Sequence, residues 1–339
     1  MQNYKVYLTT PDYPPKLGGL STFSKNVVKV LEELGFLVEV FNWKSPKDLL
    51  NLSKENIQAD FFFHIHYMGG FLTNFPLDKT INFCHGSEIL FTSPNPIKKL
   101  IKKLGKAKTL SYFSNSRANF FVSDFTREKL KEKGLQLNYG RDFVYNCSIE
   151  GIENSALAST FDSEGVIKLC SVARDVPHKN FDGIYNFSKS LGRLTNRKVQ
   201  LSITSSRFKS TEKLEVIPLL NKSDSELQQV YQDSHFNLLL SLDHSEKGFF
   251  EGFGLTTLEA GHFKTPSIVS CYGGLPENIH HRFNGFVLEN FLDSSILKFY
   301  DHALNEYSEW SKNAYSHSIN SHGLNLYKKL FKAILVEGI

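Results

Sequence analysis

The 339-residue sequence has no apolar run that approaches the roughly 18 residues a helix needs to span a bilayer. Its first fifteen residues carry one lysine and a short apolar stretch, which is unlike a secretory signal peptide. The four cysteines are scattered and form no C-x-x-C pair, so they offer no metal framework and are typical of a reducing compartment. We therefore expect a cytoplasmic protein.

Motifs of several common site types are also missing. The chain has no H-E-x-x-H sequence and no aspartates in D-x-D spacing, which disfavours a diphosphate held by a metal ion. No G-x-G-x-x-G follows the first expected strand, which argues against an NAD-dependent oxidoreductase. No nucleic-acid-binding module is recognisable, so we expect no nucleic acid among the partners.

Composition and length predict a two-domain globular protein. Hydrophobic residues make up 41% of the chain and charged residues 22%, and the length allows two domains of about 150 residues each. Through residue 150 the basic residues outnumber the acidic ones by six, whereas in the remainder the acidic residues are in excess by two. This imbalance predicts different partners for the two halves.

Strand-like and helix-like segments alternate along both halves. Strands are expected at 4–9, 36–43, 60–66, 80–85, 120–122 and 143–146, and then at 166–172, 199–204, 236–240 and 267–270. Helices are expected from about 21 and 126, and at 225–232 and 255–263. The pattern predicts an α/β fold of two Rossmann-like domains whose parallel sheets face a central cleft. We place the domains at 1–150 and 166–315, with a linker at 151–165 and a C-terminal helical segment at 316–339.

The strongest chemical signal begins at Glu251 and ends at Glu259. Between them a loop is expected to become a helix at Gly252-Phe253-Gly254-Leu255-Thr256. Glycines there let the backbone approach a ligand, and the start of a helix offers free N–H groups and a positive dipole to a diphosphate. Two carboxylates that reach one ligand from opposite sides suit a molecule with hydroxyls at both ends. The alternative is an ordinary loop before a core helix, with Glu259 solvated.

Two further segments favour an anionic ligand. Arg174 and Lys179 follow the 166–172 strand, where a cationic pair can neutralise a nucleotide diphosphate. Gly18 and Gly19 lie between the first strand and its helix, which predicts close backbone approach to an anion or a sugar. Taken singly, these residues are also explained as solvated charges and a turn.

These motifs resemble the retaining GT-B glycosyltransferases of family four. Glu251 and Glu259 stand in that family's E-x7-E arrangement, and Arg174 and Lys179 have the spacing of its G-R-L-x-x-x-K-G stretch. Ala173 and Asn180 replace the glycines of that stretch. Segments 266–270, 273–277 and 284–287 look like those that follow the glutamate motif in the family.

The resemblance implies roles for these residues. Glu251 would contact the transferred sugar and Glu259 the nucleotide ribose, while Arg174, Lys179 and the helix start would stabilise the departing diphosphate without a metal. It further implies attack on the same face of the sugar, with the leaving phosphate helping to take the acceptor's proton. The C-terminal segment is expected to cross back to the first domain, as in relatives.

The histidines differ in expected role. His85 closes a strand before Gly86-Ser87-Glu88, which is similar to the family's H-G step, where the histidine touches the donor sugar. His64 lies inside a buried strand and is expected to be structural. His66, at the end of that strand, is a candidate for the acceptor side. Metal binding by the three is a weaker alternative.

A lysine-rich helix is expected at 97–108. Ile97, Leu100, Ile101 and Leu104 fall on one helical stripe, and the remaining positions include Lys98, Lys99, Lys102, Lys103 and Lys106. A basic amphipathic helix suits an anionic membrane surface. The alternative is a helix packed on its own domain with a solvated lysine face.

Together these observations predict a retaining, metal-independent hexosyltransferase (EC 2.4) that uses a UDP-, GDP- or ADP-linked sugar. The acceptor is expected to be a glycan or a lipid-linked molecule in cell-surface polysaccharide or lipopolysaccharide assembly, with the enzyme in the cytoplasm or on the inner face of the membrane. A nucleotide-sugar epimerase and a non-catalytic nucleotide-sugar-binding protein are the alternatives. We assign catalysis to Glu251, Arg174, Lys179 and His85, donor binding to Gly19, Phe253, Gly254, Leu255, Thr256 and Glu259, and the acceptor or membrane side to Gly18, His66, Lys98, Lys102 and Lys103.

Overall fold

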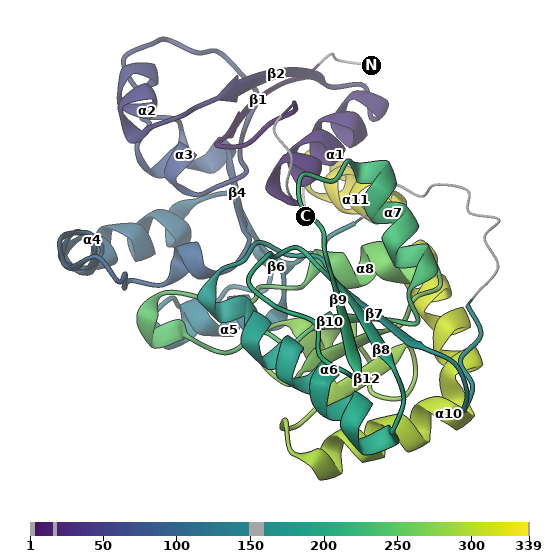
Figure 1. Cartoon of the computed structure of the whole chain (residues 1–339). Coiled ribbons are helices and arrows are strands. Elements are labelled where there is room, and N and C mark those ends of the chain that lie inside the picture. Colours follow the sequence, from purple (N-terminus) through teal and green to yellow (C-terminus); the bar gives the residue numbers. More distant parts are fainter. Residues whose placement is uncertain (1–3, 16–18, 149–158, 338–339) are drawn as a thin grey trace. The chain divides into compact units, whose positions relative to one another are not determined.

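The computed structural model describes residues 4–15, 19–148 and 159–337. The chain forms two compact units, each built on a six-stranded sheet (Figure 1). The first comprises Met1–Glu150, Ser245–Gly252 and Leu324–Ile339, and the second comprises Gly151–His244 and Phe253–Gly323. Every strand pair in both sheets is parallel. The predicted α/β fold of two Rossmann-like domains is confirmed.

The first sheet has the strand order β2-β1-β3-β4-β5-β6. Its strands are β1 (Lys5–Thr10), β2 (Leu37–Asn42), β3 (Phe61–His64), β4 (Thr80–Cys84), β5 (Ala118–Phe121) and β6 (Asp142–Val144). The helices of this unit are α1 (Gly19–Glu33), α2 (Pro46–Leu52), α3 (Met68–Phe71), α4 (Pro96–Asn115), α5 (Asp124–Glu132) and α11 (Asn325–Lys332). One face of the sheet is aromatic: the ring of Phe331 from α11 lies 5.6 Å from Phe63 and 6.1 Å from Phe83. The C-terminal helix thus packs in the first unit.

The second sheet has the order β12-β11-β10-β7-β8-β9. Its strands are β7 (Ile167–Ser171), β8 (Val199–Ile203), β9 (Leu214–Pro218), β10 (Phe236–Leu239), β11 (Ser267–Ser270) and β12 (Gly285–Leu288). Its helices are α6 (Phe181–Thr195), α7 (Asp224–Asp233), α8 (Leu255–His262), α9 (Leu275–Asn278) and α10 (Asp293–Ser316). Aromatic side chains of β10 and α10 fill its core, with Phe236 and Phe299 5.1 Å apart.

The unit boundaries differ from the predicted domains at two places. The predicted second domain includes residues 245–252, which belong to the first unit because Phe250 is buried there, 5.2 Å from the ring of Phe125. The predicted C-terminal segment begins at 316, whereas the second unit continues to Gly323 because Ser318 donates to the carbonyl of Leu258 at 3.0 Å. Most of the predicted linker, residues 151–158, lies outside the described residues.

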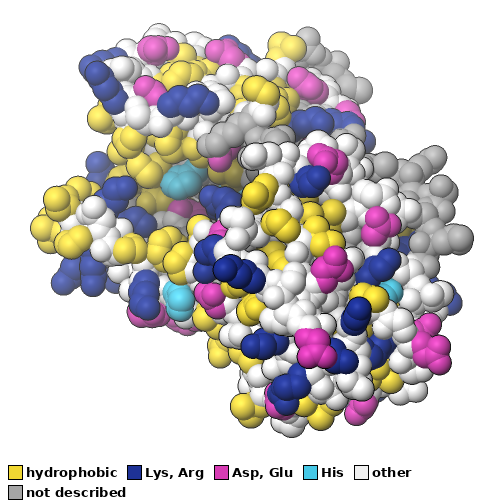
Figure 2. Space-filling view, viewed as in Figure 1, with side chains coloured by type: hydrophobic (Ala, Val, Ile, Leu, Met, Phe, Trp, Pro, Cys, Tyr) yellow, Lys and Arg dark blue, Asp and Glu magenta, His cyan; other side chains and the backbone are white. Residues whose placement is uncertain are grey.

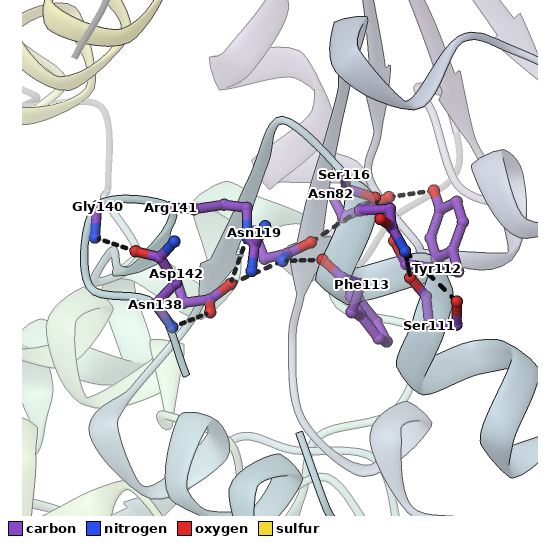
Figure 3. A network of polar contacts seen from close by, with 11 residues as sticks. Asn82, Ser111, Tyr112, Phe113, Ser116, Asn119, Asn138, Gly140, Arg141 and Asp142 are labelled. Carbon is purple, nitrogen blue, oxygen red and sulfur yellow. Dashed lines mark hydrogen bonds and ion pairs between the residues drawn. The ribbon is translucent and has the colours of Figure 1, made fainter. Parts of the chain in front are cut away.

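A row of polar side chains crosses the first sheet. Thr9, His64, Asn82, Asn119 and Asp142 are register partners from β1 to β3, β4, β5 and β6, and all are fully buried. Partners in register point to the same face of a parallel sheet, so this face carries a continuous polar line, opposite the aromatic one. Figure 3 shows its part from Asn82 to Asp142.

Hydrogen bonds join Thr9 to His64 and join Asn82, Asn119 and Asp142 to one another, and they also attach α4 to the row. Thr9 Oγ1 and His64 Nδ1 are 2.8 Å apart, Asn82 donates to Asn119 Oδ1 at 3.0 Å, and Asn119 donates to Asp142 Oδ1 at 2.7 Å. From α4, the hydroxyl of Tyr112 donates to Asn82 Oδ1 at 2.5 Å (Figure 3). A slip in strand register would leave these buried groups without partners, so the row fixes the register that sets where β3 and β4 end.

His64 makes the stability of this unit depend on pH. Burial lowers its pKa to about 3, so it stays neutral in the folded protein, while an unfolded histidine takes up a proton near pH 6.5. Stability from His64 is therefore complete above about pH 7 and is lost at up to about 1.4 kcal/mol per pH unit below about pH 6. We expect the difference in unfolding free energy between wild type and His64→Asn, measured by urea denaturation, to shrink at that rate on acidification. A difference that stays constant with pH would show that His64 takes up a proton as readily in the fold as in the unfolded chain, which contradicts the lowered pKa.

Candidate active site

Helix α8 begins at an uncapped end. Gly254 precedes it in a left-handed conformation, φ 86°, and a Cβ at Gly254 would lie 2.5 Å from Leu275 Cδ2. No side chain of the described residues caps this helix, so its start offers backbone N–H groups to an anion. Leu255 and Thr256, in its first turn, are partly exposed. The helix start predicted from the sequence is therefore at the expected residue.

The two predicted carboxylates lie in different units. Glu259 belongs to α8 in the second unit, where the hydroxyl of Tyr231 donates to its Oε2 at 3.1 Å and burial raises its pKa. Glu251 belongs to the first unit, in the loop that contains Phe250. Phe253 is buried with its ring 5.5 Å from His322, so a donor could meet only its backbone.

Arg174 and Lys179 lie in the loop after β7, and contacts of the residues beside them fix this loop. Arg174 is exposed, and Lys179 ends a 3-10 turn at Pro177–Lys179. Asp175 accepts two hydrogen bonds from Arg207, at 2.8 and 3.0 Å, and one from Ser205 at 2.7 Å. The Arg207 guanidinium holds the pKa of Asp175 below its usual value, so this link between the ends of β7 and β8 is charged at neutral pH.

Asn180 explains one departure from the family pattern. It has φ 54° and ψ 47°, the left-handed conformation that asparagine adopts more readily than most residues other than glycine. Its side chain accepts from the backbone of Gly183 at 3.1 Å and donates to the carbonyl of Leu240 at 3.0 Å. Asparagine here supplies the backbone geometry expected of glycine, caps α6, and ties the loop after β7 to the end of β10.

His85 follows β4 and is held by aromatic neighbours. Its Nδ1 lies 2.9 Å from the hydroxyl of Tyr145, and its ring is 4.6 Å from that of Phe23. Its Nε2 is buried and has no hydrogen-bond partner among the described residues. Burial, with a contribution from His66, lowers its pKa to about 3, so the imidazole is neutral. When Tyr145 donates to Nδ1, Nε2 carries the hydrogen.

Glu88 and Lys102 fix the loop that carries His85. The Glu88 carboxylate accepts from the backbone N–H of His85, and burial raises the pKa of this carboxyl. Lys102 reaches back from α4 and donates to the carbonyl of Leu90 at 3.1 Å. Lys102 therefore differs from the exposed Lys98 and Lys103, with which the sequence prediction grouped it.

At Gly252 the backbone of the loop that carries Glu251 packs against the backbone of His85. A Cβ built on Gly252 would lie 2.1 Å from the carbonyl oxygen of His85, and one on Gly86 would lie 3.4 Å from Gly252 Cα. Only glycine permits this approach of two backbones. Because Glu251 directly precedes Gly252, the first unit places two predicted catalytic residues, Glu251 and His85, at adjoining loops.

The remaining predicted residues have simpler surroundings. His66 accepts from the backbone N–H of Met68 at 3.2 Å, and burial together with Lys102 lowers its pKa to about 4. Gly19 is the first residue of α1 and is exposed, whereas Gly18 lies outside the described residues. His64 is in the polar row, consistent with the structural role expected for it.

Several residues of the site were not identified from the sequence. Tyr231 and Tyr145 look like apolar core positions, and only the structure shows their hydroxyls on Glu259 and His85. Asp175 and Arg207 are 32 residues apart, so no local pattern pairs them. Of these residues, only Glu88 could have been identified from the sequence. It follows His85 by three residues, and an acidic side chain at that spacing commonly accepts a hydrogen bond from the backbone of a turn.

Comparisons with known proteins identify the class. The family Glycosyl transferases group 1 matches residues 157–317, most of the second unit. A glycosyltransferase from Rickettsia africae shares the fold at 18% identity, with a TM-score of 0.67 and 100% of both chains covered. Anabaena HepE, solved with UDP and glucose, has 11% identity and a TM-score of 0.65 over 99% of this chain and 100% of its own. WaaG, a glycosyltransferase involved in lipopolysaccharide biosynthesis, has 14% identity and a TM-score of 0.63 over 98% and 100%. No curated protein matches the sequence significantly.

The match and the shared fold confirm the GT-B fold class and the enzyme class that the sequence predicted. Residues 157–317 match the group 1 glycosyltransferase family, and on this match the protein is a glycosyltransferase (EC 2.4). No helix in the described part of the chain is long and apolar enough to cross a membrane.

The approach of Gly252 to His85 gives a testable consequence. Gly252→Ala places a methyl group against a backbone oxygen, so one of the two loops must move. We expect a loss of about 1–3 kcal/mol of unfolding free energy and a loss of activity. Gly105→Ala within α4 is the matched control, because no described atom outside the neighbouring helix backbone lies within 4 Å of its Cβ, and it should gain about 0.5–1 kcal/mol. Equal stability of both variants in urea denaturation would contradict the packing of Gly252.

Proposed function

We propose that the protein is a retaining, metal-independent hexosyltransferase that takes its sugar from a nucleotide-diphosphate donor. One observation carries the donor site: the uncapped start of α8 and the Arg174–Lys179 loop lie at the carboxyl ends of the neighbouring strands β10 and β7. The backbone N–H of Leu242, after β10, donates to the carbonyl of His178 at 2.8 Å, which joins the two loops. Ligands of open parallel sheets bind at this edge.

The proposed chemistry assigns each group one task. Arg174, Lys179 and the first N–H groups of α8 stabilise the charge that develops on the diphosphate as the bond from the sugar's anomeric carbon breaks. Glu259, oriented by Tyr231, binds ribose hydroxyls. The acceptor oxygen attacks the face that the diphosphate leaves, and its proton passes to the departing phosphate oxygen. The proposal that the sugar keeps its anomeric configuration rests on the family resemblance.

Glu251 and His85 hold the sugar in this proposal. The adjoining loops of the first unit carry the carboxylate of Glu251 and the neutral imidazole of His85. Both groups are suited to sugar hydroxyls, since one accepts and the other donates hydrogen bonds. Glu88 positions His85 by accepting a hydrogen bond from its backbone N–H.

We propose a glycan or lipid-linked acceptor of cell-surface polysaccharide or lipopolysaccharide assembly, used in the cytoplasm at the inner face of a membrane. The role of WaaG in lipopolysaccharide biosynthesis supports this acceptor class, as HepE with UDP supports a nucleotide donor. A nucleotide-sugar epimerase or a non-catalytic binding protein would use the same donor contacts, so the fate of the donor separates these alternatives.

Donor binding is tested by thermal shift with UDP-, GDP- and ADP-linked sugars. A ligand at about a hundred times its Kd stabilises the native state by about 2.7 kcal/mol, so the correct donor should raise the Tm by several degrees. Glu259→Gln should weaken that rise, because the amide also offers donors where ribose hydroxyls need acceptors. Glu246→Gln, an exposed carboxylate, should leave it unchanged. No rise with any nucleotide sugar would overturn the proposed donor site.

Metal independence makes a separate prediction. The diphosphate is proposed to be held by Arg174, Lys179 and the α8 start, so the donor-induced rise in Tm should be the same in EDTA and in magnesium or manganese. Arg174→Ala should reduce the rise under both conditions. A rise that vanishes in EDTA and returns with a divalent cation would show that a metal ion holds the diphosphate.

A further inference from the structure

Helix α4 exposes the apolar side chains that a soluble domain would normally bury. Ile97, Leu100, Ile101 and Leu104 are 71%, 57%, 63% and 76% exposed. At about 100° per residue they fall within an arc of about 100°, so they form one stripe. Figure 2 shows hydrophobic side chains gathered at the position of α4, with basic side chains beside them.

The stripe points away from the protein's own core. Lys102, Thr109 and Phe113 are spaced to share one face of α4, and this face packs inward: Thr109 and Phe113 are buried, and Lys102 bonds to the Leu90 carbonyl. The apolar stripe lies nearly half a turn from that face. Amphipathic helices of globular domains direct their apolar stripe to the core, so the reversed orientation of α4 indicates a partner.

The charges beside the stripe indicate what that partner is. Lys98 and Lys103 are exposed and flank the stripe on its two sides, and the sequence of α4 contains no acidic residue. An apolar stripe flanked by ammonium groups complements a surface with a hydrocarbon interior and an anionic boundary, which is an anionic lipid bilayer. Two copies of the chain that met along this stripe would bring their lysines together, which disfavours self-association.

We infer that α4 docks on an anionic membrane, with Ile97, Leu100, Ile101 and Leu104 among the acyl chains and Lys98 and Lys103 at the headgroups. The inference rests on the proposed lipid-linked acceptor and identifies the surface of the protein that contacts the membrane containing that acceptor. Lys102 is not part of the docking face. Its bond to Leu90 instead attaches the docked helix to the loop of Glu88 and His85 within the same unit.

Vesicle flotation tests the inference. The wild type should bind vesicles of phosphatidylcholine and phosphatidylglycerol, bind pure phosphatidylcholine at least about tenfold less, and be released by salt. Leu100→Ser/Leu104→Ser and Lys98→Glu/Lys103→Glu should each lower binding by about tenfold or more. The matched controls are Leu50→Ser and Lys47→Glu on α2, both exposed in the same unit, which should bind like the wild type.

The outcomes separate this inference from the proposed enzyme. Donor-induced thermal shifts, measured on the same α4 variants without vesicles, should equal that of the wild type, which also shows that they fold. Wild-type protein that shows the donor shift but binds no anionic vesicles overturns the docking inference alone. Vesicle binding that the α4 variants retain also overturns it. If Leu100→Ser/Leu104→Ser abolishes a dimer in size-exclusion chromatography and leaves vesicle binding intact, the stripe is covered by a second copy and the inference is wrong.

Discussion

The approach of Gly252 to the carbonyl oxygen of His85 governs how the first unit is assembled. Two loops far apart in the sequence can pack this closely only because neither Gly252 nor Gly86 carries a side chain. The contact draws residues 245–252 out of the second unit and seats Phe250 among the aromatic side chains around Phe125. As a result Glu251 belongs to the same unit as His85, while Glu259, eight residues later, belongs to the other.

The second unit holds positive charge at the carboxyl ends of two neighbouring strands, β7 and β10. Arg174 cannot be fixed by its own exposed side chain, so its position depends on the neighbouring Asp175, which Arg207 and Ser205 bind. Asn180 fixes the other end of the loop through a left-handed backbone and a hydrogen bond to the end of β10. These contacts preorganise charge at the proposed diphosphate site before any donor binds, which is the condition under which electrostatic stabilisation is most effective.

The sequence predicted most of what depends on local pattern. Alternating apolar strands and helices predicted the fold class, and the glycines near Glu251 predicted the start of α8. Helices α6 and α10 were not predicted although their signal was present: Phe181, Ile184, Phe187 and Leu191 lie at helical spacing on α6. What could not be predicted depends on tertiary contacts. The burial of Phe250 in the first unit, the pairing of Asp175 with Arg207, and the inward turn of Lys102 among exposed lysines have no signature in adjacent residues.

The central claim is that the protein transfers a sugar from a nucleotide donor to an acceptor, and the most direct measurement is acceptor-dependent release of the nucleoside diphosphate. With the donor identified and a membrane glycolipid extract supplied, the account predicts release by the wild type and a reduction of about a hundredfold or more in Arg174→Ala/Lys179→Ala, because the charge on the leaving group loses its stabilisation. Release that does not depend on these residues, or conversion of the donor to an isomeric nucleotide sugar without release, would contradict it.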